Sequence, residues 1–385
     1  MLKVLHIGKY FPPHFGGIET FMSQLMEEQG RQGLSVSAVV HSEQLHQSGS
    51  PYNWCGCTIY EVQCYGQIIF APIAPLYPFR LIQALKTEKP DILHVHLPNL
   101  SAFWLLLLKG VLVSESQIVV HWHSDVLGAS PNMWVKLLYP VYRIFEYLLL
   151  KQSKSIVATS PNYLESSEPL KPFIDKCQVV PLGIKISDPQ SNETKSPDSA
   201  LRLNMIGRLT YYKNHKQVID AVSEIHDAGH DIRLDIVGDG ELKKTLERQV
   251  TELGVKDIVK LHGSVNDDTR NQLLETCDLL LLPSIERTEA FGVVLLEAAL
   301  LAKPALVSDV AGSGMSFVIE HGQNGLVCPT YDKDKLKNML LHYIEHRDHL
   351  ITMGKLNNRK LLSEFDIKII AKRITDVYQG NLDAS

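Results

Sequence analysis

The chain has 385 residues, more than one hydrophobic core of roughly 100–200 residues accommodates, so we expect two domains. Apolar residues make up 45% of it and charged residues 21%, which excludes a disordered, collagen-like or membrane-embedded protein. A net charge of −5 excludes the basic field that binds nucleic-acid phosphates, so we expect no nucleic-acid partner.

The first 186 residues alternate short apolar strands with helices. A strand at 3–7 leads through a loop rich in proline and glycine, 10–17, into a helix carrying Phe21 and Leu25 and then into a strand at 34–40. Further strands are predicted at 92–95, 118–121, 155–158 and 178–180, and helices at 76–86, 102–112 and 134–151. This alternation predicts a parallel, doubly wound sheet in an N-terminal domain of residues 1–186.

Residues 187–200 are polar up to Ala200 and predict an interdomain linker. The alternation then restarts and predicts a second open α/β sheet, in a C-terminal domain of residues 201–364. Its strands are predicted at 201–206, 233–237, 258–261, 279–282 and 305–307, and its helices at 214–228, 241–253, 267–276 and 291–301. Ligands of such sheets bind at the carboxyl ends of strands, so we seek site residues in the loops that follow strands.

The predicted helix at 291–301 is apolar on every side except at Glu297, so we expect it to be buried with one carboxylate inside it. A buried carboxylate needs donors, and both a protein cation and the hydroxyls of a ligand such as a ribose would serve. Glu289 lies eight residues earlier, in the loop that enters this helix. The N–H groups at the helix start would suit a phosphate. They belong to Phe291, Gly292 and Val293.

Two cations follow the strand at 201–206. Arg208 as a planar fork and Lys213 as a point charge would neutralise a diphosphate, and a solvated surface pair is the alternative. Gly16 and Gly17, which follow the first strand and precede the first helix, would let backbone N–H groups approach a phosphate. The alternative for these glycines is a flexible turn.

Two histidines, His121 and His123, stand at the end of the strand at 118–121, and strand alternation places both on the same face. One of them would hydrogen-bond a substrate or act as a base, although a structural histidine is the more frequent case. Residues 235–247 resemble the glycine loop of dinucleotide-binding proteins, but the G-x-G-x-x-G pattern is incomplete. The next strand ends in His262 and Gly263 rather than in an acid for a ribose, which argues against an NAD site.

The six cysteines show no C-x-x-C pair and no spacing with histidine that suits zinc, so we expect reduced thiols. The N-terminus alternates like a strand and does not have the pattern of a signal peptide. The apolar runs at 102–108 and 111–113 are shorter than the roughly 18–20 residues of a membrane span. We therefore expect a cytoplasmic protein, with peripheral contact to the inner face of the cytoplasmic membrane as a further option.

Taken in order, GGIE, HWHSD, GRLTYYKN, VGDGELKKTLE and EAFGVVLLE resemble the motifs of the retaining glycosyltransferases of family 4, which have the GT-B fold. The resemblance runs from the first strand to about Pro329. It implies two Rossmann-like domains facing a cleft, with the acceptor on the N-terminal domain and a nucleotide-sugar donor on the C-terminal one. It also implies a C-terminal helix, within 365–385, that packs back onto the N-terminal domain.

The resemblance implies roles for the residues in these motifs. Arg208 and Lys213 match the pair that binds the donor diphosphate, and Glu297 matches the residue that holds the ribose hydroxyls. Glu289 matches the carboxylate beside the donor sugar, and His123 matches the histidine near the reacting carbon. The other implied donor contacts are Gly16, Gly17, Gly238, Asp239, Gly240, Val265, Phe291, Gly292 and Val293.

In such a reaction the sugar–diphosphate bond breaks through an oxocarbenium-like state, and negative charge grows on the leaving group. The two cations and the helix N-terminus would stabilise that charge, and no Asp-x-Asp motif stands beside a strand, so we expect no metal and no other cofactor. Retention of configuration is implied by the resemblance alone.

The expected reaction moves a hexose, with mannose from GDP-mannose as the first choice, onto a lipid-linked or oligosaccharide acceptor of a surface polysaccharide such as lipopolysaccharide. A UDP-sugar donor, an epimerase, a phosphorylase and an inactive sugar-nucleotide-binding module are the alternatives. Lys185 stands where many relatives carry an acid, and residues 311–329 lack the common Gly-Gly-x-Pro-Glu wording, so the donor sugar stays open. Residues 135–154 set cations among apolar residues, which suits an anionic bilayer, but a core-facing helix is the favoured interpretation.

Overall fold

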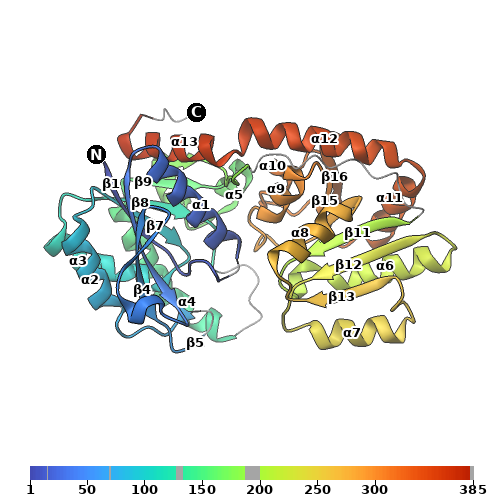
Figure 1. The fold of residues 1–385 in the computed structure, drawn as a ribbon, viewed down its shortest axis with the longest axis horizontal. Helices are drawn as coiled ribbons and strands as arrows, with labels where there is room; N and C mark the ends of the chain where they lie inside the picture. Colours follow the sequence, from blue (N-terminus) through green and yellow to red (C-terminus); the bar gives the residue numbers. More distant parts are fainter. Residues whose placement is uncertain (15, 69–70, 127–132, 187–199, 382–385) are drawn as a thin grey trace. The chain divides into compact units, whose positions relative to one another are not determined.

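The computed structural model describes residues 1–14, 16–68, 71–126, 133–186 and 200–381. They form two compact units, unit 1 with Met1–Lys185 and Asp366–Ser385, and unit 2 with Ile186–Phe365 (Figure 1). The predicted linker, 187–200, lies outside the described residues except for Ala200.

Unit 1 is built around an eight-stranded sheet in the order β10-β9-β8-β7-β1-β2-β4-β3. Its strands are β1 (Lys3–Ile7), β2 (Ser35–Ser42), β3 (Tyr52–Trp54), β4 (Cys57–Gln63), β7 (Ile92–Leu97), β8 (Gln117–Trp122), β9 (Ser155–Ala158) and β10 (Cys177–Val179). Neighbouring strands are parallel except for β3, which pairs antiparallel with β4. The expected doubly wound parallel sheet is therefore confirmed, with an antiparallel strand at one edge. A small hairpin, β5 (Gln67–Ile68) with β6 (Ala71–Pro72), stands apart from it.

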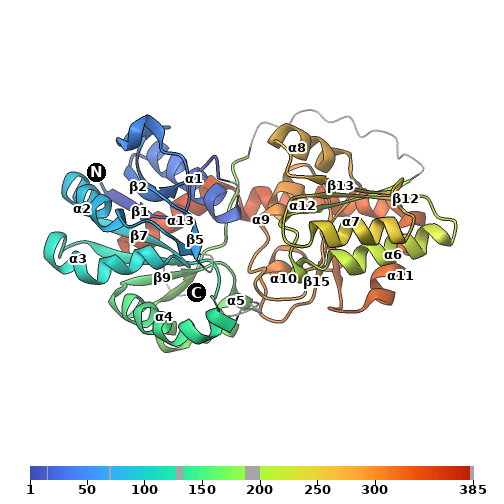
Figure 2. The ribbon, with the colours of Figure 1, turned by 90° about the horizontal axis from the view of Figure 1, so that it is seen from below.

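Helices cover both faces of this sheet. On one face α1 (Gly17–Arg31) lies beside α13 (Ile367–Gln379), whose side chains at Ile370 and Ile374 are fully buried (Figure 1). On the other face lie α2 (Tyr77–Glu88) and α3 (Leu105–Leu112) (Figure 2). The remaining helices are α4 (Met133–Gln152), α5 (Pro161–Ser166) and three short 3₁₀ turns at His46–Gly49, Leu100–Trp104 and Lys171–Lys176. The last helix of the chain thus completes the unit that the first residues begin.

Unit 2 is built around a six-stranded sheet, entirely parallel, in the order β13-β12-β11-β14-β15-β16. The strands are β11 (Leu201–Ile206), β12 (Ile232–Val237), β13 (Val259–Gly263), β14 (Leu279–Leu282), β15 (Ala305–Ser308) and β16 (Gly325–Cys328). The helices are α6 (His215–Asp227), α7 (Lys243–Glu252), α8 (Asp267–Thr276), α9 (Val293–Leu300), α10 (Met315–Val318), α11 (Lys333–Glu345) and α12 (Arg347–Glu364). In Figure 2 α6 packs beside α7, and the core beneath them is formed by aliphatic side chains of both helices and of the strands.

The second parallel sheet was also expected, and it is confirmed. The predicted helix at 291–301 begins later than expected, at Val293, because Gly292 has a left-handed backbone with φ of 82° and ends the preceding loop. None of the helices in the described part of the chain is long and apolar enough to cross a membrane.

Candidate functional site

The site residues predicted in unit 2 follow two neighbouring strands, β11 and β14, whose carboxyl ends therefore lie side by side. The loop after β11 contains Arg208 and Lys213, and the loop after β14 contains Glu289. The two loops are bonded to each other, since the Ile285 N–H donates to the Tyr212 carbonyl at 2.8 Å. This pairing holds the predicted cations and the predicted carboxylate at one end of the sheet.

Lys213 and Glu289 form an ion pair, with only 11% and 12% of their side chains exposed. The Ser284 hydroxyl, fully buried, donates to the same carboxylate oxygen at 3.4 Å. Lys213 is therefore not the solvated surface cation that the alternative interpretation proposed. Arg208 is exposed, and in the described part of the structure no carboxylate pairs with it. The guanidinium of Arg208 is thus available to an anion, next to the Lys213 ammonium that Glu289 already holds in place.

Glycines allow a third loop to approach the first. Gly238 follows β12 with φ of 136°, and a Cβ atom there would lie 2.0 Å from the Gly207 carbonyl oxygen. Gly240 has the same restriction, since its Cβ would lie 2.5 Å from the Leu209 oxygen. Asp239 between them is exposed and pairs with Lys243 at 2.9 Å. The loop after β12 therefore lies against the loop that carries Arg208.

Helix α9 begins at the same end of the sheet. Gly292 is its N-cap and offers no side chain, so the first N–H groups of the helix have no side-chain cap. A Cβ at Gly292 would lie 2.7 Å from Leu282, which explains the glycine at this position. Phe291 is buried against Phe365, with ring centroids 6.1 Å apart, and Val293 is half-buried. This N-terminus is a suitable place for an anion.

Glu297 lies one turn into α9. Burial raises the pKa of its carboxyl group, and the nearby Arg270 guanidinium opposes that shift. Arg270 lies 3.6 Å from one carboxylate oxygen, looser than a hydrogen bond. The internal ion pair that the sequence left open is thus present, with a partner on α8 that no spacing in the sequence indicated. The carboxylate keeps the capacity to accept further hydrogen bonds.

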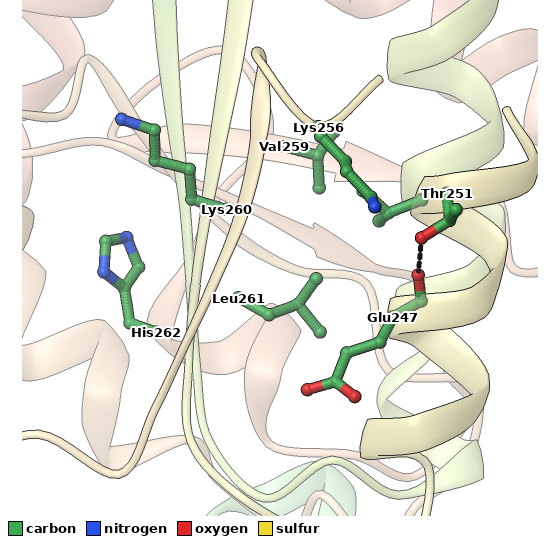
Figure 3. A pocket seen from close by; sticks show the side chains of 8 residues that line it. Glu247, Thr251, Lys256, Val259, Lys260, Leu261 and His262 are labelled. Atoms are coloured by element: carbon green, nitrogen blue, oxygen red, sulfur yellow. Dashed lines mark hydrogen bonds between the residues drawn. The ribbon is translucent and has the colours of Figure 1, made fainter. Parts of the chain in front are cut away.

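Val265 follows β13 and is half-buried. A surface hollow of about 500 Å³ lies between α7 and β13, and its lining includes Glu247, Thr251 and Leu261 but not Val265 (Figure 3). Lys260 and His262 lie on the other side of the strand from Leu261 in this view. None of the residues that we predicted for the donor lines this hollow, so it is not the predicted site.

In unit 1 the predicted residues Gly16 and Gly17 stand at the start of α1, and His123 lies against Phe21 of the same helix. Gly16 is the N-cap of α1, and a Cβ there would lie 2.1 Å from a Glu19 carboxylate oxygen. One turn further, the Phe21 ring lies edge-on to the ring of His123 at 5.9 Å. The start of α1 and the end of β8 therefore meet at the carboxyl edge of this sheet.

His123 is 4% exposed, and its Nε2 lies 2.9 Å from Nδ1 of His96. Burial lowers its pKa to about 3, so the ring is neutral at physiological pH. His121 stacks on it with ring centroids 4.3 Å apart, as strand alternation predicts. Both belong to a group that we call the histidine cluster. Its members are His6, His94, His96, His121 and His123.

Sequence reasoning missed three members of this cluster. The alternating His94-Val95-His96 in a buried strand is the signal that would have found two of them. Two trios, which share His96, bring ring nitrogens within 4.8 Å of one another, a spacing that a metal ion can use. In the described structure these nitrogens are instead joined by hydrogen bonds.

Helix α4 is not the core-facing helix that we favoured for residues 135–154. Apolar side chains at helical spacing point away from the core rather than into it, among them Leu137 at 64% exposure and Ile144 at 59%. The others on this stripe are Leu138, Val141, Phe145 and Leu148. The core-facing side is narrow and includes Leu149 and Leu150, both fully buried.

Two family models match the chain. The model described as "Glycosyl transferase 4-like domain" matches residues 16–183, and the model "Glycosyl transferases group 1" matches residues 187–360. The O-antigen chain mannosyltransferase C of Escherichia coli is 28% identical over 98% of this chain and 97% of its own. D-rhamnosyltransferase WbpZ of Pseudomonas aeruginosa is 28% identical over 92% and 90%. The structure of sucrose-phosphate synthase from Thermosynechococcus elongatus superposes with a TM-score of 0.79 at 17% identity, covering 99% of both chains.

Proposed function

Because the chain belongs to the GT-B glycosyltransferases, with a glycosyl transferase 4-like domain followed by a group 1 domain, we propose that it transfers a hexose from a nucleotide-sugar to a lipid-linked or oligosaccharide acceptor. The names of two relatives, an O-antigen chain mannosyltransferase and a D-rhamnosyltransferase, support a role in surface polysaccharide synthesis. The first of these names also supports mannose as the sugar, and GDP-mannose is the first donor to test. Retention of configuration is part of this proposal.

The observation that carries the proposal is the pair of cations after β11, Arg208 and Lys213, beside the Glu289 carboxylate after β14. When the bond between C1 of the sugar and the diphosphate breaks, the electron pair stays on the phosphate oxygen. The acceptor hydroxyl oxygen bonds to C1, and its proton passes to the departing diphosphate. In this proposal Arg208, which has no carboxylate partner among the described residues, receives that charge. Lys213 and the uncapped N–H groups of α9 add to it.

Glu289 and Glu297 have separate roles in this proposal. Glu289 keeps the Lys213 ammonium at the strand end before the donor binds, and its carboxylate then accepts hydrogen bonds from the hydroxyls of the sugar. Glu297, loosely held by Arg270, accepts from the ribose hydroxyls. On the same reasoning the charge on the leaving group is balanced by protein groups, so we propose that transfer needs no divalent metal.

The test is donor binding and turnover in a matched set of variants. We expect GDP to raise the melting temperature more than UDP, ADP or dTDP, and mannose transfer to continue in EDTA. Lys213→Ala should weaken GDP binding by about 10- to 100-fold, the effect of losing one charged hydrogen bond. Lys333→Ala is the control, because Lys333 also forms an ion pair with a glutamate in unit 2 but lies on α11, outside the predicted site.

Four results would contradict parts of this proposal. Full activity in Lys213→Ala or Glu289→Ala would remove those residues from the site. A response to UDP alone would change the donor base, and a change in the sugar nucleotide without any acceptor would indicate an epimerase. Loss of transfer in EDTA, restored by a divalent ion, would refute metal independence.

The exposed stripe on α4 supports a second element of the proposal, contact with an anionic bilayer. Six apolar side chains face solvent, and Arg143 and Lys151 stand on the same helix. We expect sedimentation with vesicles rich in phosphatidylglycerol and weak binding to phosphatidylcholine. Replacing Leu138 and Val141 together by Asp should abolish it, whereas Ile351→Asp, at an exposed apolar position of unit 2, should not. A concentration-dependent dimer that the double variant abolishes would show instead that this stripe binds a second copy.

A further inference from the structure

The histidine cluster occupies one face of the unit 1 sheet. Its members come from three neighbouring strands and the residue after β8, and the pairing register sets His6 opposite His94 and His96 opposite His121. This face is covered by α1 and α13, which contribute Gln29 and Tyr378. All five imidazoles are 4% exposed or less.

A continuous chain of hydrogen bonds runs through three of these rings. The Gln29 side-chain oxygen lies 2.9 Å from Nε2 of His6, and Nδ1 of His6 lies 3.0 Å from Nε2 of His96. Nδ1 of His96 lies 2.9 Å from Nε2 of His123. The chain therefore leads from an amide between the two covering helices to a residue of the predicted site.

The Gln29 amide gives this chain a direction. Its NH₂ group donates to the Tyr378 hydroxyl at 3.0 Å, which leaves its oxygen as the acceptor for His6. Burial lowers the pKa of His6 to about 4 and of His123 to about 3, and that of His96 well below its usual value, so each ring carries one proton. A neutral imidazole that donates from one nitrogen accepts at the other.

Applied in turn to the three rings of the chain, this rule fixes which nitrogen of each ring carries the proton. His6 donates from Nε2 to Gln29 and accepts at Nδ1 from His96. His96 accepts at Nδ1 from the Nε2–H of His123. Nδ1 of His123 is then a bare lone pair, and it is buried with no hydrogen-bond partner among the described residues.

We propose that His6 and His96 are positioning residues that hold His123 in the Nε2–H tautomer, so that its Nδ1 accepts a hydrogen bond from a sugar hydroxyl of the substrate. The proposal rests on the proposed function only for the identity of that hydroxyl. A lone pair accepts from a hydroxyl and repels a phosphate oxygen, so the tautomer selects which part of a nucleotide-sugar lies against this ring. The opposite tautomer would present an N–H and favour the phosphate.

The test is the ring ¹⁵N NMR spectrum of the full chain labelled at histidine, recorded without substrate at pH 7.5. We expect the spectrum to show Nε2 of His123 protonated and Nδ1 bare. In His96→Leu the Nε2–H tautomer of His123 should lose its dominance, and kcat/KM for the sugar-nucleotide should fall about tenfold, the effect of one neutral hydrogen bond. His41→Leu is the matched control, because His41 is a buried, hydrogen-bonded histidine of the same sheet, outside the cluster.

A wild-type spectrum with Nδ1 of His123 protonated would overturn the proposal and needs no variant that must fold. The proposal would also be overturned if the His123 tautomer were the same in His96→Leu as in the wild type. Loss of the histidine N–H signals on adding Zn²⁺ would overturn it too, because it would show a metal site. Gln29→Met is the second variant and should weaken the same preference from the far end of the chain. If the tautomers are as expected but no sugar-nucleotide binds, the proposed function fails and the hydrogen-bonded chain stands.

Discussion

Acidification should unfold unit 1 selectively, because the unit buries neutral histidines. Burial lowers the pKa of all five rings of the histidine cluster, and it lowers that of His41 to about 4. In the unfolded chain each of these rings titrates near 6.5. Below that pH the unfolded state binds more protons than the folded one, so the free energy of unfolding falls as the pH falls.

The size of the effect follows from the unfolded pKa. Between pH 7.5 and 5.5 each histidine that stays neutral in the fold lowers the stability by about 1.4 kcal/mol, or about 8 kcal/mol for six. Glu146 opposes this, because burial raises its pKa to about 7 and the folded state takes up its proton, which adds about 2 kcal/mol. The remaining loss of about 6 kcal/mol is comparable to the whole stability of a domain.

Differential scanning calorimetry at the two pH values measures this loss. We expect the transition of unit 1 to move down by about 10–20 °C from pH 7.5 to pH 5.5. In His96→Leu the shift should be smaller by the share of one histidine, whereas exposed His14→Asn should leave it unchanged. A unit 1 transition within two or three degrees at both pH values would refute the reasoning, because it would mean that the rings are charged in the fold.

Three substitutions test individual contacts. Gly238→Ala should lower the unfolding free energy of unit 2 by at least about 2 kcal/mol, because its Cβ would lie 2.0 Å from a carbonyl oxygen; urea titration measures this, and Gly254→Ala, with open space around its Cβ, is the control for strain alone. Glu297→Gln should raise KM for the donor about tenfold with little change in kcat, in steady-state kinetics; an unchanged KM would assign Glu297 to Arg270 alone. Tyr378→Phe should destabilise unit 1 by about 1–3 kcal/mol in urea, since it leaves the buried Gln29 amide without its acceptor.

Much of the fold could be predicted from the sequence because parallel strands buried on both faces read as short apolar runs. β14 (LLLL) and β11 (LRLNMI) were placed to the residue, and β8 differs by one residue at each end. The antiparallel edge pair β3 and β4 and the last parallel strand, β16, were not predicted. β3 (YNW) and β4 (CTIYEVQ) mix polar and apolar residues, and β16 (GLVC) is a run of only four residues that begins with glycine, so none of them gives a clear strand signal.

The favoured interpretation of α4 failed for a related reason. Periodicity finds an apolar stripe on a helix but does not say what covers it. In α4 the stripe that includes Leu137 and Ile144 is exposed, and the sheet is reached by another side of the helix. Only the packing of the unit distinguishes a core-facing stripe from an exposed one.

The candidate site, too, could be predicted from the sequence only in part. Arg208, Lys213 and Glu289 could be proposed from the sequence because each follows a strand, and the adjacency of β11 and β14 brings their loops together. Their pairing, and that of Glu297 with Arg270, depends on side chains that meet only in the fold. The position of the proton on His123 depends even less on the local sequence. Its place is set through His96 and His6 by an amide whose own orientation depends on Tyr378, 349 residues away along the chain. A residue type can therefore indicate that a histidine stands at the site, but which of its nitrogens is free is a property of the whole unit.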